Sequence, residues 1–207
     1  MANVKNSPLN DLQFDVLKEI GNIGSGHAAT ALAKLLNQKV DIKVPKAELC
    51  AFKDLPDLVG GAENIVIGIL LALSGEVDGM MMFIMDRKPA YNLVKKLMWT
   101  DIDENAELSE MQLSALQEIG NIITGAYLSS LSDLTRLTIN ASVPYIAIDM
   151  AGAILSVPAI EFGKLGDHAL MIEAQFSDDA ADGINGYFLL IPTFDSYNAI
   201  MKSLGCM

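Results

Sequence analysis

"KEIGNI" occupies Lys18–Ile23, and "QEIGNI" occupies Gln117–Ile122, 99 positions later. Each stretch places a glutamate and an asparagine three residues apart, with isoleucine and glycine between them. If the two stretches mark equivalent places in two related segments, the similarity should extend well beyond six letters.

The similarity extends over most of the chain. Residues 10–45 and 109–144 align at a constant offset of 99, and 12 of the 36 aligned pairs are identical. Further on, "GMMMFIMDRKPAYNLVKKL" from Gly79 corresponds to "GYFLLIPTFDSYNAIMKSL" from Gly186, at an offset of 107. The offset grows by 107 − 99 = 8 residues, so the second copy carries an insertion in its middle.

A repeat of about 100 residues is too long for a solenoid, in which each unit spans 20 to 50 residues. We therefore predict that residues 1–207 form a single domain made of two repeats related by a pseudo-twofold axis. The repeats cover about 10–99 and 109–205, and the acidic segment 100–108 links them.

Each repeat opens with a long predicted helix. Asn10 and Ser109 are suitable N-cap residues, and Gln13 and Gln112 stand three places on, which is the capping-box spacing. The helices should run to about residues 37 and 136. Strands and a short helix should follow in each copy, which gives an α+β domain with helices packed on an antiparallel or mixed sheet. We expect strands at 40–52, 64–73, 76–85, 139–150, 152–162, 169–175 and 186–191, and helices at 88–99 and 194–204.

The composition restricts the possible functions. The formal net charge is −12, which argues against nucleic-acid binding, because phosphate backbones attract basic surfaces. The longest apolar run, Ile65–Leu73, has nine residues, whereas a membrane-spanning helix needs about 20. No secretory signal pattern is visible at the N-terminus, and Cys50 and Cys206 match no metal-ligand spacing. We expect a cytoplasmic protein with reduced thiols and no membrane insertion.

A helical wheel places the repeated polar residues on one stripe. Asp15, Glu19, Asn22 and Gly26 fall within about 60° of one another, as do Ser114, Glu118, Asn121 and Gly125 in the second copy. An apolar stripe, predicted to face the sheet, lies roughly 90° away. It comprises Leu12, Val16, Ile20 and Ile23, and in the second copy Met111, Ala115, Ile119 and Ile122.

The polar stripe has two interpretations. An ordinary solvated helix face is the simpler one. A functional face is favoured because Gly21, Gly24 and Gly26 interrupt one helix within two turns, and each costs about 1 kcal/mol relative to alanine. Close approach of another molecule would explain that cost. In addition, both copies retain glutamate, glycine and asparagine while their neighbours differ.

The chemistry available to such a face is limited. A glutamate and an asparagine without nearby histidine or cysteine make a poor metal site, and the sequence has neither a phosphate-binding loop nor a paired nucleophile and base. A carboxamide can nevertheless donate and accept hydrogen bonds at once, so it can hold a water against an electrophile. That suffices only if a partner supplies the metal and most of the transition-state electrostatics.

These residues resemble a known family. Asp15-x3-Glu19-x2-Asn22-x22-Pro45 and its counterpart from Ser114 to Pro144 are similar to the paired signatures of the CheC family, which are phosphatases of the chemotaxis response regulator CheY. The resemblance covers nearly the whole chain. A single such site is typical of the related CheX, and extra switch-binding segments are typical of FliY. The family fold has two long helices over a sheet built by both repeats.

The resemblance implies specific roles. Each Glu–Asn face would enter the active site of phosphorylated CheY, where Asn22 or Asn121 would orient the attacking water. Glu19 or Glu118 would pair with a lysine of the regulator. The protein would need no cofactor or metal of its own, because Mg²⁺ would belong to CheY. The remaining contacts to the regulator would come from Asp15, Ser114, Gly21, Gly26, Gly120 and Gly125.

A second partner is also implied. CheC proteins bind the receptor deamidase CheD, and by resemblance Asp149 in "IAIDMAGAI" would lie on that surface. An aspartate that merely ends a strand is the alternative. The expected protein is thus a monomeric, cytoplasmic hydrolase of two-component chemotaxis signalling.

Two other functions remain open from the sequence. A non-catalytic adaptor could sequester CheY-P or regulate CheD with the same signature as a docking surface. A small-molecule enzyme is the third reading, although no catalytic triad, phosphate loop or ligand cluster supports it.

Overall fold

The computed structural model describes residues 11–103, 106–162, 168–178 and 181–205. Its first half contains α1 (Asp11–Leu36), β1 (Asp41–Ala51), η1 (Phe52–Asp54), α2 (Leu55–Leu58), β2 (Ile65–Gly75), β3 (Gly79–Asp86) and α3 (Arg87–Met98). Its second half contains α4 (Glu110–Thr135), β4 (Ile139–Ala141), β5 (Tyr145–Met150), α5 (Ala151–Phe162), β6 (His168–Asp178), β7 (Ala181–Pro192) and α6 (Phe194–Ser203). The predicted α+β class is confirmed.

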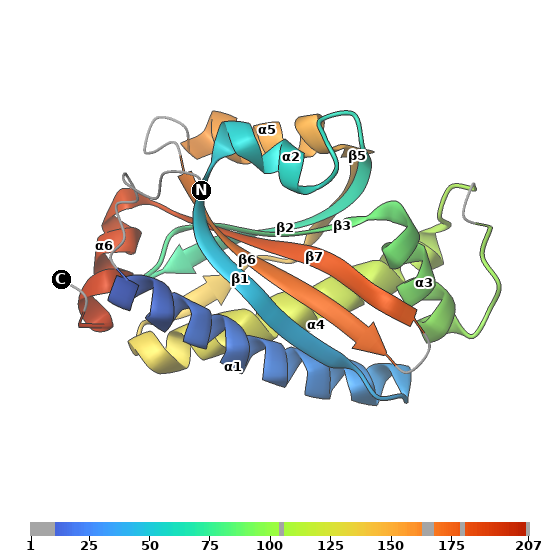
Figure 1. Cartoon of the computed structure of the whole chain (residues 1–207), viewed down its shortest axis with the longest axis horizontal. Helices are drawn as coiled ribbons and strands as arrows, with labels where there is room; N and C mark the ends of the chain where they lie inside the picture. Colours follow the sequence, from blue (N-terminus) through green and yellow to red (C-terminus); the bar gives the residue numbers. More distant parts are fainter. Residues whose placement is uncertain (1–10, 104–105, 163–167, 179–180, 206–207) are drawn as a thin grey trace.

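One sheet runs through the molecule and contains strands from both halves (Figure 1). The strand order is β1-β6-β7-β3-β2-β4, and β5 pairs with β2 on the same side as β4. Every pairing among the described strands is antiparallel, so the sheet is antiparallel rather than mixed.

The two halves exchange their first strands. β2 and β3 form a hairpin in the first half, and β6 and β7 form its counterpart in the second. β1 leaves its own hairpin and pairs with β6, whereas β4 and β5 pair with β2. The hairpins join through β3 and β7, where Met82 lies opposite Leu189. Because 189 − 82 = 107, this pair joins equivalent residues of the two repeats, as a pseudo-twofold axis at that point requires.

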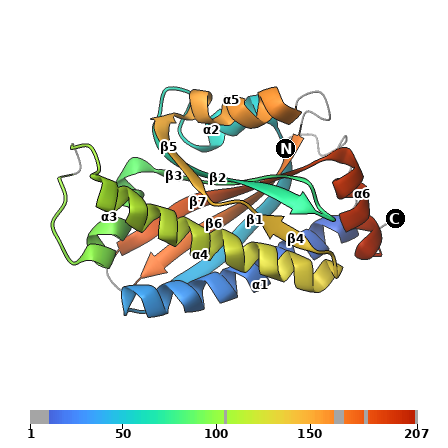
Figure 2. The same ribbon diagram turned by 180° about the vertical axis from the view of Figure 1, so that it is seen from behind.

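The two long helices cover one face of the sheet. α1 and α4 lie side by side and run in opposite directions, while α2 and α5 cover the other face (Figures 1 and 2). The larger apolar core lies under α1, α3 and α4, and a smaller core lies under α2 and α5. The predicted capping box of α4 is confirmed, because the Ser109 N–H donates to Gln112 Oε1 at 2.8 Å and the Gln112 N–H donates to Ser109 Oγ at 3.4 Å. Asn10, predicted to cap α1, lies outside the described residues.

The predicted strand at 152–162 is wrong, because this segment is helix α5. Ala151, Ile154, Leu155 and Pro158 are buried, and this i, i+3, i+4, i+7 spacing is helical. Apolar residues also occupy the outer face of the helix, for example Ile160. That continuous apolar character masked the helical period in the sequence. The short helices η1 and α2, which occupy the equivalent place in the first repeat, were not predicted either.

The two signature prolines interrupt edge strands. The β1–β6 register shifts between Lys43 and Lys46, around Pro45. Pro144 lies in the gap between β4 and β5, so the predicted strand at 139–150 is divided in two. Proline lacks the N–H that a ladder needs, and it is therefore tolerated at edges and bulges. The shared proline thus has a structural role in each repeat.

The buried side of α1 differs from the predicted stripe. Leu17, Gly24, Ala28 and Leu32 face the core together with Ile20, whereas Leu12 is 60% exposed. In α4 the equivalent of Leu12, Met111, is 71% exposed. The centre of the buried stripe is rotated by about 100° from its predicted position, counting 100° per residue.

The helices cross at close range. A Cβ on Gly24 would lie 2.9 Å from Tyr127 Cδ1 and 3.1 Å from its Cα, so only glycine fits there. The Ser25 and Tyr127 hydroxyls form a buried hydrogen bond across the crossing. Burial raises the pKa of Tyr127 to about 12, with the Ser25 hydrogen bond acting in the opposite direction.

We predict that Gly120→Ala destabilises the protein by about 1–3 kcal/mol through overpacking. A Cβ at this position would lie 2.8 Å from Ile69 Cγ2. Gly125→Ala is the matched control, because nothing lies within 4 Å of its added Cβ, and it should stabilise the helix by up to about 1 kcal/mol. Urea unfolding measures both. Equal effects of the two substitutions would contradict the packing described for Gly120.

A second prediction concerns alkaline pH. Because the pKa of Tyr127 rises from 10.0 to about 12 on folding, its stabilising contribution is complete below pH 10 and is lost as the pH rises through 12. Tyr127→Phe should cost about 1 kcal/mol at pH 8, the typical value of a hydrogen bond. This difference should shrink at pH 11, since the variant has no phenol to ionise. Urea unfolding at both pH values tests this, and a constant difference would count against it.

Candidate functional site

The polar residues singled out in the sequence lie on the outward faces of α1 and α4. Glu19, Asn22, Glu118 and Asn121 are all exposed, and so are Asp15 and Ser114. Because the buried stripe is centred near Leu17 and Gly24, the Glu–Asn stripe lies on the opposite side of each helix, about 180° away rather than 90°. The side chains therefore project away from the sheet, which leaves them open to a large partner.

The glycines of the signature have two different roles. Gly26 and Gly125 are exposed, and nothing lies within 4 Å of an added Cβ. Gly21 and Gly120 are buried against the sheet, where an added Cβ would lie 3.2 Å from Ile172 Cγ2 and 2.8 Å from Ile69 Cγ2, respectively. The prediction that Gly21 and Gly120 contact a partner is therefore wrong. They allow each helix to approach its own sheet closely.

The two Glu–Asn pairs do not converge into one site. Each pair lies in the first half of its helix, and the helices run in opposite directions (Figure 2). Glu19 and Asn22 thus lie toward one end of the helix pair, and Glu118 and Asn121 lie toward the other. The molecule presents two separate faces.

The four side chains are available for contacts. Within the described part of the chain, they make no hydrogen bond or ion pair with another residue. Each belongs to a 26-residue helix packed on the sheet, so the backbone that carries it is rigid. A rigid backbone with unengaged side chains is suited to enter a partner's site without rearranging itself.

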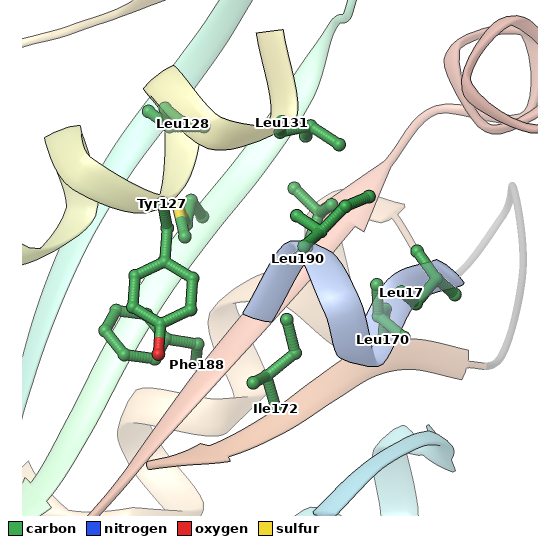
Figure 3. A pocket seen from close by; sticks show the side chains of 10 residues that line it. Leu17, Tyr127, Leu128, Leu131, Leu170, Ile172, Phe188 and Leu190 are labelled. Atoms are coloured by element: carbon green, nitrogen blue, oxygen red, sulfur yellow. The ribbon is translucent and has the colours of Figure 1, made fainter. Parts of the chain in front are cut away.

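Two interior features of the described residues, a small cavity and a buried thiol, lack the groups or the ionisation that catalysis would need. A cavity of about 20 Å³ lies between α1, α4 and the sheet (Figure 3), but its lining, which includes Leu17, Leu131 and Phe188, is apolar. A cavity of that kind holds at most one water and is normally dry. Burial, aided by Glu48 and Asp54, raises the pKa of Cys50 to about 11, so this free thiol stays protonated at neutral pH.

The surroundings of the two faces differ in their contacts and in their burial. Gln117 Nε2 donates to the carbonyl of Pro144 at 2.5 Å and so ties α4 to the gap between β4 and β5. Its counterpart in the first repeat, Lys18, is exposed. Val44 is buried beside Gly21, whereas its counterpart Val143 is 85% exposed. In the sequence, the difference between the aligned residues Lys18 and Gln117 is the visible sign that the two faces have different surroundings.

Asp149 lies on a different surface. It is exposed near the end of β5 and pairs with Val66, which belongs to the core under α2 and α5. Opposed residues of an antiparallel pair point to the same face of the sheet. Asp149 therefore points toward the α5 face, on the other side of the sheet from α1 and α4. Its Oδ1 accepts the Met150 N–H at 2.7 Å, which leaves the rest of the carboxylate accessible.

Within the described residues, no three His, Cys, Asp or Glu side chains gather closely enough to hold a metal ion. No helix in the described ranges combines the length and hydropathy needed to cross a membrane.

The chain is similar to proteins of known families. Residues 12–49 and 111–148 match the model of the CheC-like family, and these segments contain both Glu–Asn pairs. The CheY-P phosphatase CheC of Bacillus subtilis (strain 168) is 39% identical over 197 residues, which cover 93% of this chain and 94% of that protein. The flagellar motor switch phosphatase FliY of the same organism is 30% identical over 142 residues, which cover 68% of this chain and 36% of FliY.

A solved structure shares the fold. Thermotoga maritima FliY superposes with a TM-score of 0.76 at 22% identity, and the match covers 96% of this chain and 98% of that one. At this identity the structural likeness bears on the fold alone. The identity to CheC over nearly the full length of both chains decides the family, and this protein belongs to the CheC-like family.

Proposed function

We propose that this protein is a chemotaxis phosphatase that dephosphorylates the phosphorylated response regulator CheY. The observation that supports it best is the pair of exposed Glu–Asn faces on rigid helices, one in each repeat. The substrate follows from the CheC relative, which is named for its action on CheY-P.

The proposed chemistry divides the work between the two proteins. Asn22 or Asn121 holds a water in line with the phosphorus of the regulator's aspartyl phosphate, using its amide to accept and donate at once. The water oxygen bonds to phosphorus, the aspartate carboxylate leaves, and inorganic phosphate takes the water's protons. Glu19 or Glu118 pairs with a lysine of the regulator and so fixes the position of the asparagine. Mg²⁺ arrives with the regulator and neutralises charge on the phosphoryl oxygens.

Because the regulator supplies the metal and the phosphoryl group, two residues at each site are enough for catalysis. Positioning alone contributes several kcal/mol when the reacting atoms are held close together. The outward orientation of both pairs fits the requirement, because a regulator's active site must reach the asparagine from outside. Asp15 and Ser114 lie one turn before each glutamate on the same exposed face and would contact the rim of the regulator.

A second partner, the deamidase CheD, is proposed for the surface around Asp149. The location supports it, since Asp149 is exposed on the face opposite to α1 and α4. A partner bound there would leave both Glu–Asn faces open. The protein could then bind CheY-P and CheD at the same time.

The asparagines provide the test of the phosphatase function. Asn22→Ala with Asn121→Ala should abolish stimulated phosphate release from CheY-P, while binding to CheY loaded with beryllium fluoride persists. The substitutions are at exposed positions, so the thermal unfolding midpoint should change little. Phosphate release is followed continuously against CheY alone, with each single variant measured separately. If the wild-type protein left the regulator's own rate unchanged, the protein would instead be a non-catalytic adaptor.

Charge reversal tests the second surface. Asp149→Lys should weaken capture of CheD at least tenfold, because it replaces an exposed anion at the proposed contact. Stimulated phosphate release without CheD should stay at the wild-type level. Asp133→Lys, at an exposed position near the end of α4, is the matched control. Equal CheD capture by both variants would place that interface elsewhere.

A further inference from the structure

Each Glu–Asn face continues into an exposed apolar residue. Leu12 is 60% exposed and Met111 is 71% exposed, and they are equivalent residues at the offset of 99. Each precedes its glutamate by seven residues, which is two turns along the same line of the helix. At 1.5 Å per residue, the spacing along the helix axis is about 10 Å.

The apolar character is retained where the core does not require it. The periodicity of the sequence assigned Leu12 and Met111 to the core-facing stripe, yet the structure leaves both in solvent. A single exposed apolar side chain needs no explanation. Here the same position is apolar and exposed in both repeats, beside the same Glu–Asn pair, although the two repeats differ at most other positions.

A regulator bound at either Glu–Asn pair would also cover Leu12 or Met111, because protein interfaces are wide. A standard interface covers about 800 Å² on each partner, which is a disc of about 16 Å radius. Centred between Glu19 and Asn22, such a disc reaches Leu12, which lies about 13 Å away along the helix. The same spacing holds for Met111 with Glu118 and Asn121.

We propose that Leu12 and Met111 are apolar anchors that bind the response regulator at the first and second sites, respectively. This inference rests on the proposed function and adds the residues that determine affinity. In this proposal each side chain packs against apolar surface of the regulator beside its phosphorylation site. Such an anchor contributes to binding in both the ground state and the transition state, so its loss should affect KM and not kcat.

Single-site backgrounds separate the two anchors. Leu12→Ser in an Asn121→Ala protein, in which only the first site is active, should raise KM for CheY-P about tenfold with kcat changed less than twofold. Met111→Ser in an Asn22→Ala protein should do the same for the second site. The crossed combinations are internal controls: Leu12→Ser in the Asn22→Ala protein, and Met111→Ser in the Asn121→Ala protein, should leave KM unchanged.

The dissociation constant for CheY tests the anchors independently of phosphatase activity. The double variant Leu12→Ser, Met111→Ser should bind Mg²⁺- and beryllium-fluoride-loaded CheY at least tenfold more weakly than the wild-type protein. Ile160→Ser, at a 73% exposed position on α5, is the matched control and should bind normally. A wild-type protein that bound CheY without hydrolysing its phosphate would overturn the phosphatase proposal while still testing the anchors.

Three results would overturn the anchor proposal. The first is an unchanged KM in both single-site backgrounds. The second is an unchanged dissociation constant for the double variant. The third is a wild-type dimer in sedimentation that the double variant abolishes without any loss of CheY affinity, since that would assign the apolar residues to a contact between two copies of this chain.

Discussion

The exchange of first strands between the two repeats holds the sheet together and determines where both long helices pack. β1 pairs with β6, and β5 pairs with β2, so each repeat adds a strand to the edge of the other repeat's hairpin. The central β3–β7 pairing joins the hairpins into one surface. That surface is wide enough to support both long helices, and the two helices are held antiparallel because the repeats are related by the pseudo-twofold axis through Met82 and Leu189.

The close packing of the helices on this sheet determines which way the polar side chains point. Gly21 and Gly120 let the helices approach side chains of the sheet, and Gly24 lets α1 approach Tyr127 of α4. With these glycines facing inward, Glu19, Asn22 and their counterparts can only face outward. The same geometry separates the two polar pairs, so the protein has two faces in place of one enclosed active site.

Much of the fold and of the candidate site could be predicted from the sequence, because a feature that occurs in both repeats rarely arises by chance. The long helices, the strands that form the two hairpins and the Glu–Asn pairs were all predicted from aligned residues. The rotation of α1 and α4 about their own axes was not predicted, because isoleucines next to the glycines made the apolar periodicity ambiguous. A glycine that faces the sheet adds no apolar side chain to the pattern. Helix α5 was mistaken for a strand because apolar residues such as Val157 and Ile160 occupy its exposed side as well. The Gln117–Pro144 contact joins residues 27 positions apart and became visible only in three dimensions.

In the proposed function, the outward faces of α1 and α4 complete the catalytic centre of another protein. The most direct measurement follows the side-chain amide NMR signals of Asn22 and Asn121 while Mg²⁺- and beryllium-fluoride-loaded CheY is added. We expect both signals to shift and to saturate as the regulator is added, while amides on α5 do not change. Unperturbed asparagine signals, with the shifts confined to the α5 face, would contradict it.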